Sequence, residues 1–434
     1  MTNVTLQLHD QRVNGELVIP GDKSISHRAI MLGALASGTT NVSNFLDGDD
    51  CLNTASIFRA LGVTIDIDGT DVRIEIEGQS AWQTPSGPLY AGNSGTTARL
   101  LLGLLAGSTV EATITGDRYL SKRPMDRIVE PLRDMGAVIT SEEEALVLPI
   151  HVKGGTLEPF EYAPPVASAQ VKSAILFAGL GADGTTTVHE QSKTRDHTER
   201  MMEQFGVTLR EEGLSVSIEG GQTLQATDVV VPGDISSAAF FLAAGAIKEG
   251  SDLLLKRVGL NETRTGMLDV MRDMGADVTI EREVREKGEP YGDLRIRYAP
   301  LRGVDISSEA LMPRLIDELP IIALLATQAD GVTTIRNAEE LRVKETDRIT
   351  AVVSQLNALG ASIEELPDGM KITGPTPLRG GSIDSYGDHR LGMMGAIASL
   401  VAKEPVTVVD TDCITISYPE FFKHLEKVTA TSVQ

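Results

Sequence analysis

The sequence predicts an α/β protein of two domains, each built from three similar α/β units. The chain has 434 residues, which is more than one ordinary hydrophobic core supports. A short phrase consisting of a helix end, a glycine and a β-branched strand also recurs at intervals of roughly 70–85 residues, which indicates an internal repeat. The glycine supplies the left-handed residue that ends a helix before a strand begins. It occupies positions Gly62, Gly136, Gly206, Gly275 and Gly360.

A second series of segments runs in step with the first. These segments are long, rich in small and aliphatic residues, and apolar on nearly all sides, so we expect them to be buried helices. Alternating short strands and amphipathic helices lie between them, which is typical of α/β units. The six apolar helices are predicted to begin near Ser24, Ser94, Ser168, Ser236, Asp317 and Asp388.

The two halves of the chain repeat one strand-to-helix phrase. Residues Ile19–Ser24 read IPGDKS, and residues Val231–Ser236 read VPGDIS. We interpret these two positions as the crossings between domains. The sequence therefore predicts a discontinuous domain formed by residues 1–20 and 235–434, a second domain formed by residues 21–234, and a substrate cleft between them.

Composition excludes several classes of function. The formal net charge of −22 argues against nucleic acid or an anionic membrane as a partner. Cys51 and Cys413 occur in unrelated contexts, so they form no disulfide framework or zinc spacing. No apolar stretch is long enough for a membrane span, and the N-terminus lacks a signal-peptide pattern. We therefore expect a cytoplasmic protein.

The beginnings of the predicted apolar helices carry cations. A cation in the first turn opposes the helix macrodipole and destabilises the helix, whereas unpaired N–H groups there favour a bound anion. Lys23, Arg28 and Arg390 lie at such positions, so they indicate anion binding. Dense basic segments lie elsewhere at 121–127, 192–199 and 342–348. The sequence contains no P-loop, no GxGxxG after a strand and no GxSxG elbow.

Each of these features also has a purely structural interpretation. Ser24, Ser94 and Ser168 are ordinary N-cap residue types, and Asp317 is a candidate cap ahead of Pro320. Alternating charges within 342–348 are typical of a solvated helix face. His197 and His389, taken singly, are typical structural histidines. The anion hypothesis depends on the set as a whole.

Several segments, taken together, resemble the EPSP synthase family of 3-phosphoshikimate 1-carboxyvinyltransferases. They read GDKSISHR at 21–28, GNSGTT at 92–97, RPM at 123–125, RVKETDR at 342–348 and DHR at 388–390. The resemblance extends in order from about residue 7 to residue 425. It implies the enolpyruvyl transferase fold, a two-domain inside-out α/β barrel with three pseudosymmetric βαβαββ-like repeats in each domain, and closure of the domains on the substrates.

Other segments resemble the second, glyphosate-tolerant class of that family. They are SAQVK at 168–172, RDHTE at 195–199 and NETR at 261–264, together with GDKS at 21–24. Ile416 stands where the first class has a lysine near the C-terminus, and Gly95 is kept near the glyphosate contact. The resemblance thus implies the tolerant class, with glyphosate as a weak inhibitor.

The resemblance implies two sets of substrate-binding residues. Shikimate 3-phosphate would be held by Lys23, Ser24, Arg28, Ser168, Ala169, Gln170, Arg195, Asp317 and Lys344. Phosphoenolpyruvate would be held by Lys23, Asn93, Gly95, Thr96, Arg123, Gln170, Glu345, Arg348, His389 and Arg390. Arginine forks suit phosphate and carboxylate groups, and lysine acts as a point charge. We expect a monomer that needs no metal or organic cofactor.

The implied reaction is an addition followed by an elimination. The 5-hydroxyl of shikimate 3-phosphate attacks C2 of phosphoenolpyruvate while C3 is protonated, and the tetrahedral ketal then loses phosphate. Asp317 is the candidate base, with Lys23 as a second candidate, and Glu345 or Lys23 handles the C3 proton. Two alternatives stay open. One is the related transferase acting on UDP-N-acetylglucosamine, which uses a loop cysteine. The other is a non-catalytic anion-binding relative.

Overall fold

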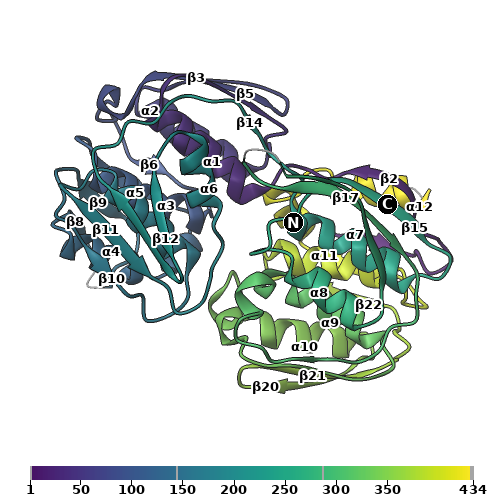
Figure 1. The fold of residues 1–434 in the computed structure, drawn as a ribbon. Coiled ribbons are helices and arrows are strands. Elements are labelled where there is room, and N and C mark those ends of the chain that lie inside the picture. The colour runs from purple at the N-terminus through teal and green to yellow at the C-terminus, as the bar shows by residue number, and fades with distance from the viewer. Residues whose placement is uncertain (1, 143–144, 286–287, 431–434) are drawn as a thin grey trace. The chain divides into compact units, whose positions relative to one another are not determined.

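The computed structural model describes residues 2–142, 145–285 and 288–430. The chain forms two compact units (Figure 1). Unit 1 contains Met1–Pro20, Pro232–Arg285 and Pro290–Gln434, and unit 2 contains Gly21–Val231 and Glu286–Glu289. The change of unit in mid-chain thus falls at Pro232, three residues before the predicted position of 235, and residues 286–289 join unit 2. Within the described ranges, no helix has the length and apolar character needed to span a bilayer.

Unit 2 is built from three buried helices packed against three sheets. In each sheet, two neighbouring strands are parallel and the remaining pairings are antiparallel. The sheets have the orders β14-β3-β5-β4, β6-β7-β9-β8 and β10-β11-β13-β12. Their strands are β3 (Ser37–Ser43), β4 (Thr64–Asp68), β5 (Asp71–Glu77), β6 (Leu89–Tyr90), β7 (Glu111–Thr115), β8 (Val138–Ser141), β9 (Ile150–Lys153), β10 (Glu161–Tyr162), β11 (Thr185–His189), β12 (Leu209–Glu212), β13 (Ser215–Glu219) and β14 (Val229–Val230).

The helices of unit 2 alternate between a buried and an amphipathic kind. The buried helices are α1 (Lys23–Leu35), α3 (Gly95–Ala106) and α5 (Ala169–Gly179), and α3 packs against both α1 and α5 (Figure 1). Each sheet packs its apolar face on one of these helices, as the alternating burial of β5 illustrates. The amphipathic helices are α2 (Asp49–Ala60), α4 (Asp126–Asp134) and α6 (His197–Gln204).

Unit 1 repeats the arrangement. Its sheets have the orders β16-β17-β15-β2, β18-β19-β21-β20 and β1-β23-β22. The strands are β1 (Val4–Leu6), β2 (Asn14–Val18), β15 (Asp252–Gly259), β16 (Asp277–Val284), β17 (Tyr291–Arg297), β18 (Asp305–Ile306), β19 (Gly331–Ile335), β20 (Ser362–Leu366), β21 (Gly369–Gly374), β22 (Gly381–Asp384) and β23 (Val406–Val409). The helices are α7 (Ile235–Ile247), α8 (Gly266–Asp273), α9 (Leu319–Thr327), α10 (Arg348–Ala358), α11 (His389–Ala398) and α12 (Phe421–Thr429).

The core of unit 1 is formed by helices α7, α9 and α11, which pack against one another. All residues of α7 are buried, as its apolar composition predicts. Short 3-10 turns precede or connect the helices at η3 (Met312–Arg314), η4 (Ile316–Glu318), η5 (Glu339–Val343) and η6 (Thr411–Ile416). In unit 2 the corresponding turns are η1 (Gln79–Ala81) and η2 (Leu120–Lys122). Each unit has its own contiguous apolar core.

The predicted α/β repeats are confirmed in detail. The five glycines that were expected to end helices follow α2, α4, α6, α8 and α10, and all have φ between 86° and 94°. A side chain there would be strained. The order of elements is β-α-β-α-β-β in the first five repeats, for example β6, α3, β7, α4, β8 and β9, whereas the last repeat has the order β22, α11, β23, α12 and its sheet is completed by β1. Helices lie inside and sheets outside, so the predicted inside-out α/β barrel class is correct.

Strands β2 and β14 are exchanged between repeats. β2 comes before α1 in the chain but pairs in parallel with β15 of unit 1, whereas β14 comes before α7 but pairs in parallel with β3 of unit 2. Their pairings account for the discontinuity of unit 1. Each strand is followed by one of the two equivalent phrases. Ile19–Ser24 connects β2 to α1, and Val231–Ser236 connects β14 to α7.

Candidate active site

The buried helices of unit 2 begin with capped N-termini. Asp22 accepts a hydrogen bond from the N–H of Ile25, Ser94 accepts one from Thr97, and Ser168 accepts one from Val171. Ser94 and Ser168 are therefore N-caps. Ser24 is not a cap, because Asp22 has that role and Ser24 lies in the first turn of α1. Ser24 and Ser168 are both half-buried.

Arg28 lies in the second turn of α1 rather than the first, and each nitrogen of its guanidinium donates a hydrogen bond inside unit 2. Nε donates to the Thr198 hydroxyl at 2.7 Å, Nη2 to the Ser173 hydroxyl at 2.9 Å, and Nη1 to the Ser24 carbonyl at 3.0 Å. Burial lowers the pKa of Arg28 to about 10, partly offset by the charge of Glu199. Arg28 therefore stays a cation at neutral pH and joins α1, α5 and α6.

A group of amide and guanidinium side chains forms where α3 and α5 begin. Gln170 donates to the Thr96 hydroxyl at 3.0 Å and accepts from Arg99 at 2.7 Å. Arg123, which follows η2, donates to the Asn93 side-chain oxygen at 2.7 Å. The structure thus brings together Asn93, Thr96, Arg123 and Gln170, which the sequence placed around phosphoenolpyruvate.

Gly95 lies at the centre of this group. A Cβ atom at Gly95 would lie 3.1 Å from Nη1 of Arg99 and 3.4 Å from Nη1 of Arg123. Contacts of this length are tighter than ordinary van der Waals packing. The absence of a side chain at Gly95 therefore lets two guanidinium groups approach the first turn of α3, where N–H groups also favour an anion.

Lys23, the first residue of α1, forms an ion pair with Asp50 of α2. The Lys23 Nζ and Asp50 Oδ2 atoms are 2.5 Å apart, and the side chains are 23% and 6% exposed. An adjacent carboxylate favours the ammonium form. This contact argues for Lys23 as a cation or proton donor and against it as a base.

Arg195 precedes α6 and is half-buried. Together with burial, its positive charge lowers the pKa of Arg28. The two cations therefore lie in the same part of unit 2. Ser168 and Ala169 begin α5, whose Ser173 contacts Arg28. His197 Nδ1 is 2.6 Å from Glu289 Oε1, with both side chains buried, which supports a structural role for that histidine.

In unit 1, Arg348 is the centre of an acid-rich cluster. Its Nε atom donates to Asp388 Oδ2 at 2.7 Å, and Nη2 donates to Asp388 Oδ1 at 3.2 Å and to Glu345 Oε2 at 2.6 Å. Burial alone would lower the pKa of Arg348, but the charges of Asp388 and Glu345 outweigh it and raise that pKa. The side chain is 1% exposed, so the segment 342–348 is not merely a solvated helix face.

Asp317 lies beside the same cluster, in η4. Its Oδ1 atom is 3.5 Å from Arg348 Nη1 and 3.8 Å from Lys344 Nζ, and its Oδ2 atom is 4.0 Å from Arg390 Nη2. Glu318, and not Asp317, occupies the N-cap position of α9. Three cations, two from the segment 342–348 and one from α11, therefore lie near one carboxylate that is 13% exposed.

A second buried group supports Asp317 from within unit 1. Arg264 donates to the Ser236 hydroxyl at 2.7 Å, and Ser236 in turn donates to Glu318. Arg390 Nη1 lies 3.8 Å from the same Glu318 carboxylate. The N-cap of α7 is Asp234, not Ser236. Ser236 and Arg264 thus fix Glu318, the residue next to Asp317.

The remaining predicted residues of unit 1 lie at the ends of helices. His389 is the first residue of α11, buried, and Arg390 follows it after the Asp388 cap. Ile416 ends η6 and packs, partly buried, against the apolar core of unit 1. Ile416 therefore contributes packing and no charge.

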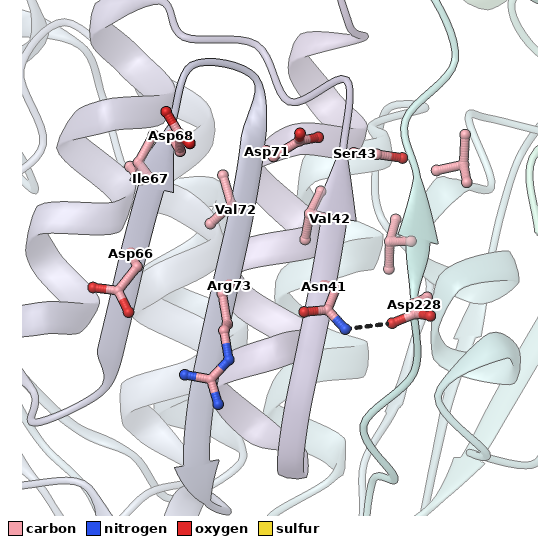
Figure 2. A pocket seen from close by; sticks show the side chains of 12 residues that line it. Asn41, Val42, Ser43, Asp66, Ile67, Asp68, Asp71, Val72, Arg73 and Asp228 are labelled. Carbon is pink, nitrogen blue, oxygen red and sulfur yellow. Dashed lines mark hydrogen bonds between the residues drawn. The ribbon is translucent and has the colours of Figure 1, made fainter.

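A cavity of about 470 Å³ lies on a sheet of unit 2, away from these residues (Figure 2). It is lined by side chains of β3, β4, β5 and β14, among them Asp66, Asp68 and Asp71, and Asn41 donates to Asp228 at 2.8 Å. None of the predicted site residues lines it. Its acidic lining is unsuited to the anionic ligands indicated by the helix starts.

Sequence reasoning missed three residues that contact side chains at the starts of the buried helices of unit 2. Arg99 lies one turn into α3 and contacts Gln170, Asp50 pairs with Lys23, and Glu190 lies directly after β11 in contact with Lys172. The spacing of Arg99 from Ser94 gave a signal, since it places a cation near a helix start. Asp50 and Glu190 gave none, because their partners lie 27 and 18 residues away in sequence.

Comparison with known proteins is consistent with this geometry. A family model described as EPSP synthase (3-phosphoshikimate 1-carboxyvinyltransferase) matches residues 9–425. A 3-phosphoshikimate 1-carboxyvinyltransferase of Bacillus pumilus is 56% identical over 96% of this chain and 98% of its own length. One of Bacillus subtilis is 54% identical over 97% of this chain and 99% of its own length.

Solved structures agree with the fold. A structure of EPSP synthase from Acinetobacter baumannii, 42% identical, covers 100% of both chains with a TM-score of 0.90. The enolpyruvyl transferase NikO from Streptomyces tendae, 18% identical, covers 100% of this chain and 98% of its own with a TM-score of 0.82, and it supports the fold alone. The chain therefore belongs to the EPSP synthase (3-phosphoshikimate 1-carboxyvinyltransferase) family.

Proposed function

We propose that this chain transfers the enolpyruvyl group of phosphoenolpyruvate to the 5-hydroxyl of shikimate 3-phosphate and releases phosphate. One observation carries the proposal. Asp317 is a partly exposed carboxylate surrounded by Lys344, Arg348 and Arg390. This arrangement offers a proton acceptor beside cations that stabilise developing phosphate charge. Membership of the family supplies the identity of the two substrates.

The two units supply different parts of the chemistry in this proposal. Unit 2 binds the phosphate of shikimate 3-phosphate through Lys23, Ser24, Ser168 and Arg195, with Arg28 buried behind them. Its group of Asn93, Gly95, Thr96, Arg123 and Gln170 binds phosphoenolpyruvate, and Arg99 joins that group because it contacts Gln170. Unit 1 adds Lys344, Arg348, His389 and Arg390 together with the carboxylates. Both groups are required for turnover.

Asp317 takes the proton of the 5-hydroxyl as the oxygen attacks C2. In the same phase the protonated carboxyl group of Glu345 gives its proton to C3, which produces a methyl group, a tetrahedral ketal and the Glu345 carboxylate. C3 then loses a proton and the C2–O bond to phosphate breaks, so the enolpyruvyl double bond is restored. Glu345 handles the C3 proton. It is held by Arg348 at 2.6 Å, which favours the carboxylate and suits the proton-accepting phase.

Cysteine chemistry is a weaker alternative. Cys51 is fully buried, and Cys413 is 8% exposed. Burial raises the pKa of Cys413 to about 11, so its thiolate is scarce at neutral pH. This disfavours a transferase that depends on a loop cysteine, such as the one acting on UDP-N-acetylglucosamine. The intact cluster around Asp317 likewise disfavours a non-catalytic relative.

We further propose that the chain is a monomeric member of the glyphosate-tolerant class. Ile416 supports the assignment to this class, because it packs against the core of unit 1 and offers no positive charge to the inhibitor. Gly95 argues for sensitivity to glyphosate, because it has no side chain that would keep a ligand from the first turn of α3 beside Arg99 and Arg123. Weak inhibition, rather than complete insensitivity, is the expected result.

The test is release of inorganic phosphate from phosphoenolpyruvate and shikimate 3-phosphate, with and without glyphosate. We expect one phosphate to be released for each molecule of product formed. We expect no phosphate release when either substrate is omitted. No release above background would overturn the proposed activity. Strong inhibition by glyphosate would leave the activity standing and refute the tolerant class.

A further inference from the structure

Lys172 is a buried lysine that the proposed reaction does not use. It lies in the first turn of α5, with a side chain 1% exposed. Its Nζ atom contacts Oε2 of Glu190 at 3.0 Å and Oε1 of Glu199 at 2.6 Å, and these side chains are 3% and 1% exposed. A buried ammonium group is stable only when it is paired in this way.

The two carboxylates bracket the segment that carries Arg195. Glu190 directly follows β11, and Glu199 lies in the first turn of α6. The other oxygen of Glu190 accepts the N–H of Thr194 at 3.0 Å and also the Thr194 hydroxyl. A chain of contacts therefore leads from Lys172 through Glu190 to the residue immediately before Arg195.

The far end of the segment is fixed as well. Thr198, next to Glu199, exchanges a hydrogen bond with Ser173 at 2.7 Å and accepts one from Arg28 at 2.7 Å. The start of α6 is thereby joined to α5 and α1. Arg195 leaves the backbone between these two fixed points.

Four buried side chains of this cluster carry two positive and two negative charges. Arg28 and Lys172 provide two cations, and Glu190 and Glu199 provide two carboxylates. Burial lowers the pKa of Arg28, and the charge of Glu199 partly offsets this. Burial also raises the pKa of Glu199, and the charge of Lys172 partly offsets that. Removing Lys172 alone leaves two buried carboxylates facing each other. The segment 190–199 then lacks the cation that contacts the carboxylates at both of its ends.

We propose that Lys172 is a positioning residue for Arg195, which it places for the phosphate of shikimate 3-phosphate by holding Glu190 and Glu199. The inference rests on the proposed function of Arg195. A purely structural role predicts a different outcome. Buried ion pairs can often be replaced by apolar side chains with little loss of stability, but an apolar side chain cannot hold Glu190 against Thr194.

The experiment is a double-mutant cycle between Lys172→Met and Arg195→Ala in the full chain, read as the KM for each substrate. Each single change should raise the KM for shikimate 3-phosphate roughly tenfold or more, with the KM for phosphoenolpyruvate changed less than about twofold. The double variant should match Arg195→Ala alone, because Lys172 acts through Arg195.

Lys193→Met is the matched control. It removes one lysine charge from the same segment, where Lys193 pairs with Glu211 at the surface, 35% exposed. Its KM for shikimate 3-phosphate should stay within about twofold of the wild type. An equal effect of Lys193→Met would show that net charge, and not the position of Arg195, sets the KM.

A charge-balanced variant keeps the test valid if Lys172→Met does not fold. Lys172→Met with Glu190→Gln removes one cation and one carboxylate together. We expect it to fold with a melting temperature near that of the wild type and to retain the raised KM for shikimate 3-phosphate. Recovery of the KM along with the melting temperature would overturn the proposal in favour of a structural role.

The outcomes also distinguish the proposed function of Arg195 from the proposed role of Lys172. If Arg195→Ala leaves the KM for shikimate 3-phosphate unchanged, the proposed function of Arg195 is wrong. If Arg195→Ala raises that KM, but Lys172→Met either has no effect or adds its full effect to that of Arg195→Ala, the role of Lys172 is wrong and the role of Arg195 stands.

Discussion

The two units hold their cations in different ways. In unit 2, Arg28 donates to hydroxyl and carbonyl oxygens, and Arg123 donates to the Asn93 amide oxygen. In unit 1, Arg348 donates to the carboxylates of Asp388 and Glu345 and lies beside Asp317. Neutral acceptors fix a guanidinium without cancelling its charge, whereas carboxylates cancel it.

This difference suits different tasks. A guanidinium held by neutral oxygens keeps its attraction for a phosphate or carboxylate of a ligand. A carboxylate held by cations keeps a defined position and an ionised state, which a proton acceptor needs. The two lysines Lys23 and Lys172 depart from the rule in unit 2, because Lys23 pairs with Asp50 and Lys172 pairs with two buried glutamates. We therefore expect changes in unit 2 to weaken substrate binding and changes at Asp317 to slow turnover.

The largest expected effect follows from Asp317→Asn. Loss of the proton acceptor should lower kcat about 10³- to 10⁴-fold, with each KM changed by only a few-fold. Steady-state phosphate release measures both. Asp305→Asn, an exposed aspartate of β18 in the same unit, is the control and should behave as the wild type. Equal losses in kcat and in binding would reduce Asp317 to a structural or binding role.

Arg348→Met should cause the largest loss of stability. It leaves Asp388 and Glu345 without their shared cation in a buried site, which costs about 3–5 kcal/mol of unfolding free energy. Urea unfolding measures it. Arg342→Met is the matched control, since Arg342 pairs with Asp347 and Glu365 at 27% exposure and should cost less than about 1 kcal/mol. Similar losses of unfolding free energy in both variants would contradict the claim that the buried ion pairs of Arg348 stabilise unit 1 more than a surface pair does.

Arg195→Ala should have an intermediate effect, confined to one substrate. Loss of a charge-assisted contact worth about 1.5–3 kcal/mol raises the KM for shikimate 3-phosphate on the order of 10- to 100-fold. The KM for phosphoenolpyruvate and kcat should change little. Arg210→Ala, on the exposed strand β12, provides the comparison. A rise in the KM for phosphoenolpyruvate instead would move Arg195 to the other substrate.

The smallest expected effect follows from Gly95→Ala. The new Cβ meets the ends of Arg99 and Arg123 at 3.1 and 3.4 Å, and both side chains are flexible enough to shift by a few tenths of an ångström. We expect the KM for phosphoenolpyruvate to rise roughly threefold. Gly87→Ala, where nothing lies within 4 Å of the new Cβ, should leave the KM for phosphoenolpyruvate unchanged. An unchanged KM in Gly95→Ala would place phosphoenolpyruvate away from the first turn of α3.

Local features of the sequence predicted the fold well. The glycine that ends each amphipathic helix and the apolar composition of the buried helices are both properties of short segments, so they are legible without a structure. The equivalent phrases before α1 and α7 also marked the places where β2 and β14 leave their repeats. The assignment of 286–289 to unit 2 was not foreseen, because no motif in the sequence of this segment distinguishes it from its neighbours.

The candidate site was predicted in part. Residue types at helix starts, such as Lys23 and Arg390, indicated anion binding. The partners of those residues could not be predicted, since Arg28 contacts Ser173 across 145 positions and Arg348 contacts Asp388 across 40. Ser24 was misread as a possible cap because Asp22, two residues earlier, is an equally good one.

The most direct test of the division of labour is phosphate release by Asp317→Asn and Arg195→Ala at saturating concentrations of both substrates. At saturation a defect in binding disappears, whereas a defect in proton transfer persists. We predict near wild-type turnover for Arg195→Ala and at least about a 10³-fold loss for Asp317→Asn. The reverse pattern, or equal losses in both variants, would contradict the assignment of anion binding to unit 2 and of proton transfer to Asp317 in unit 1.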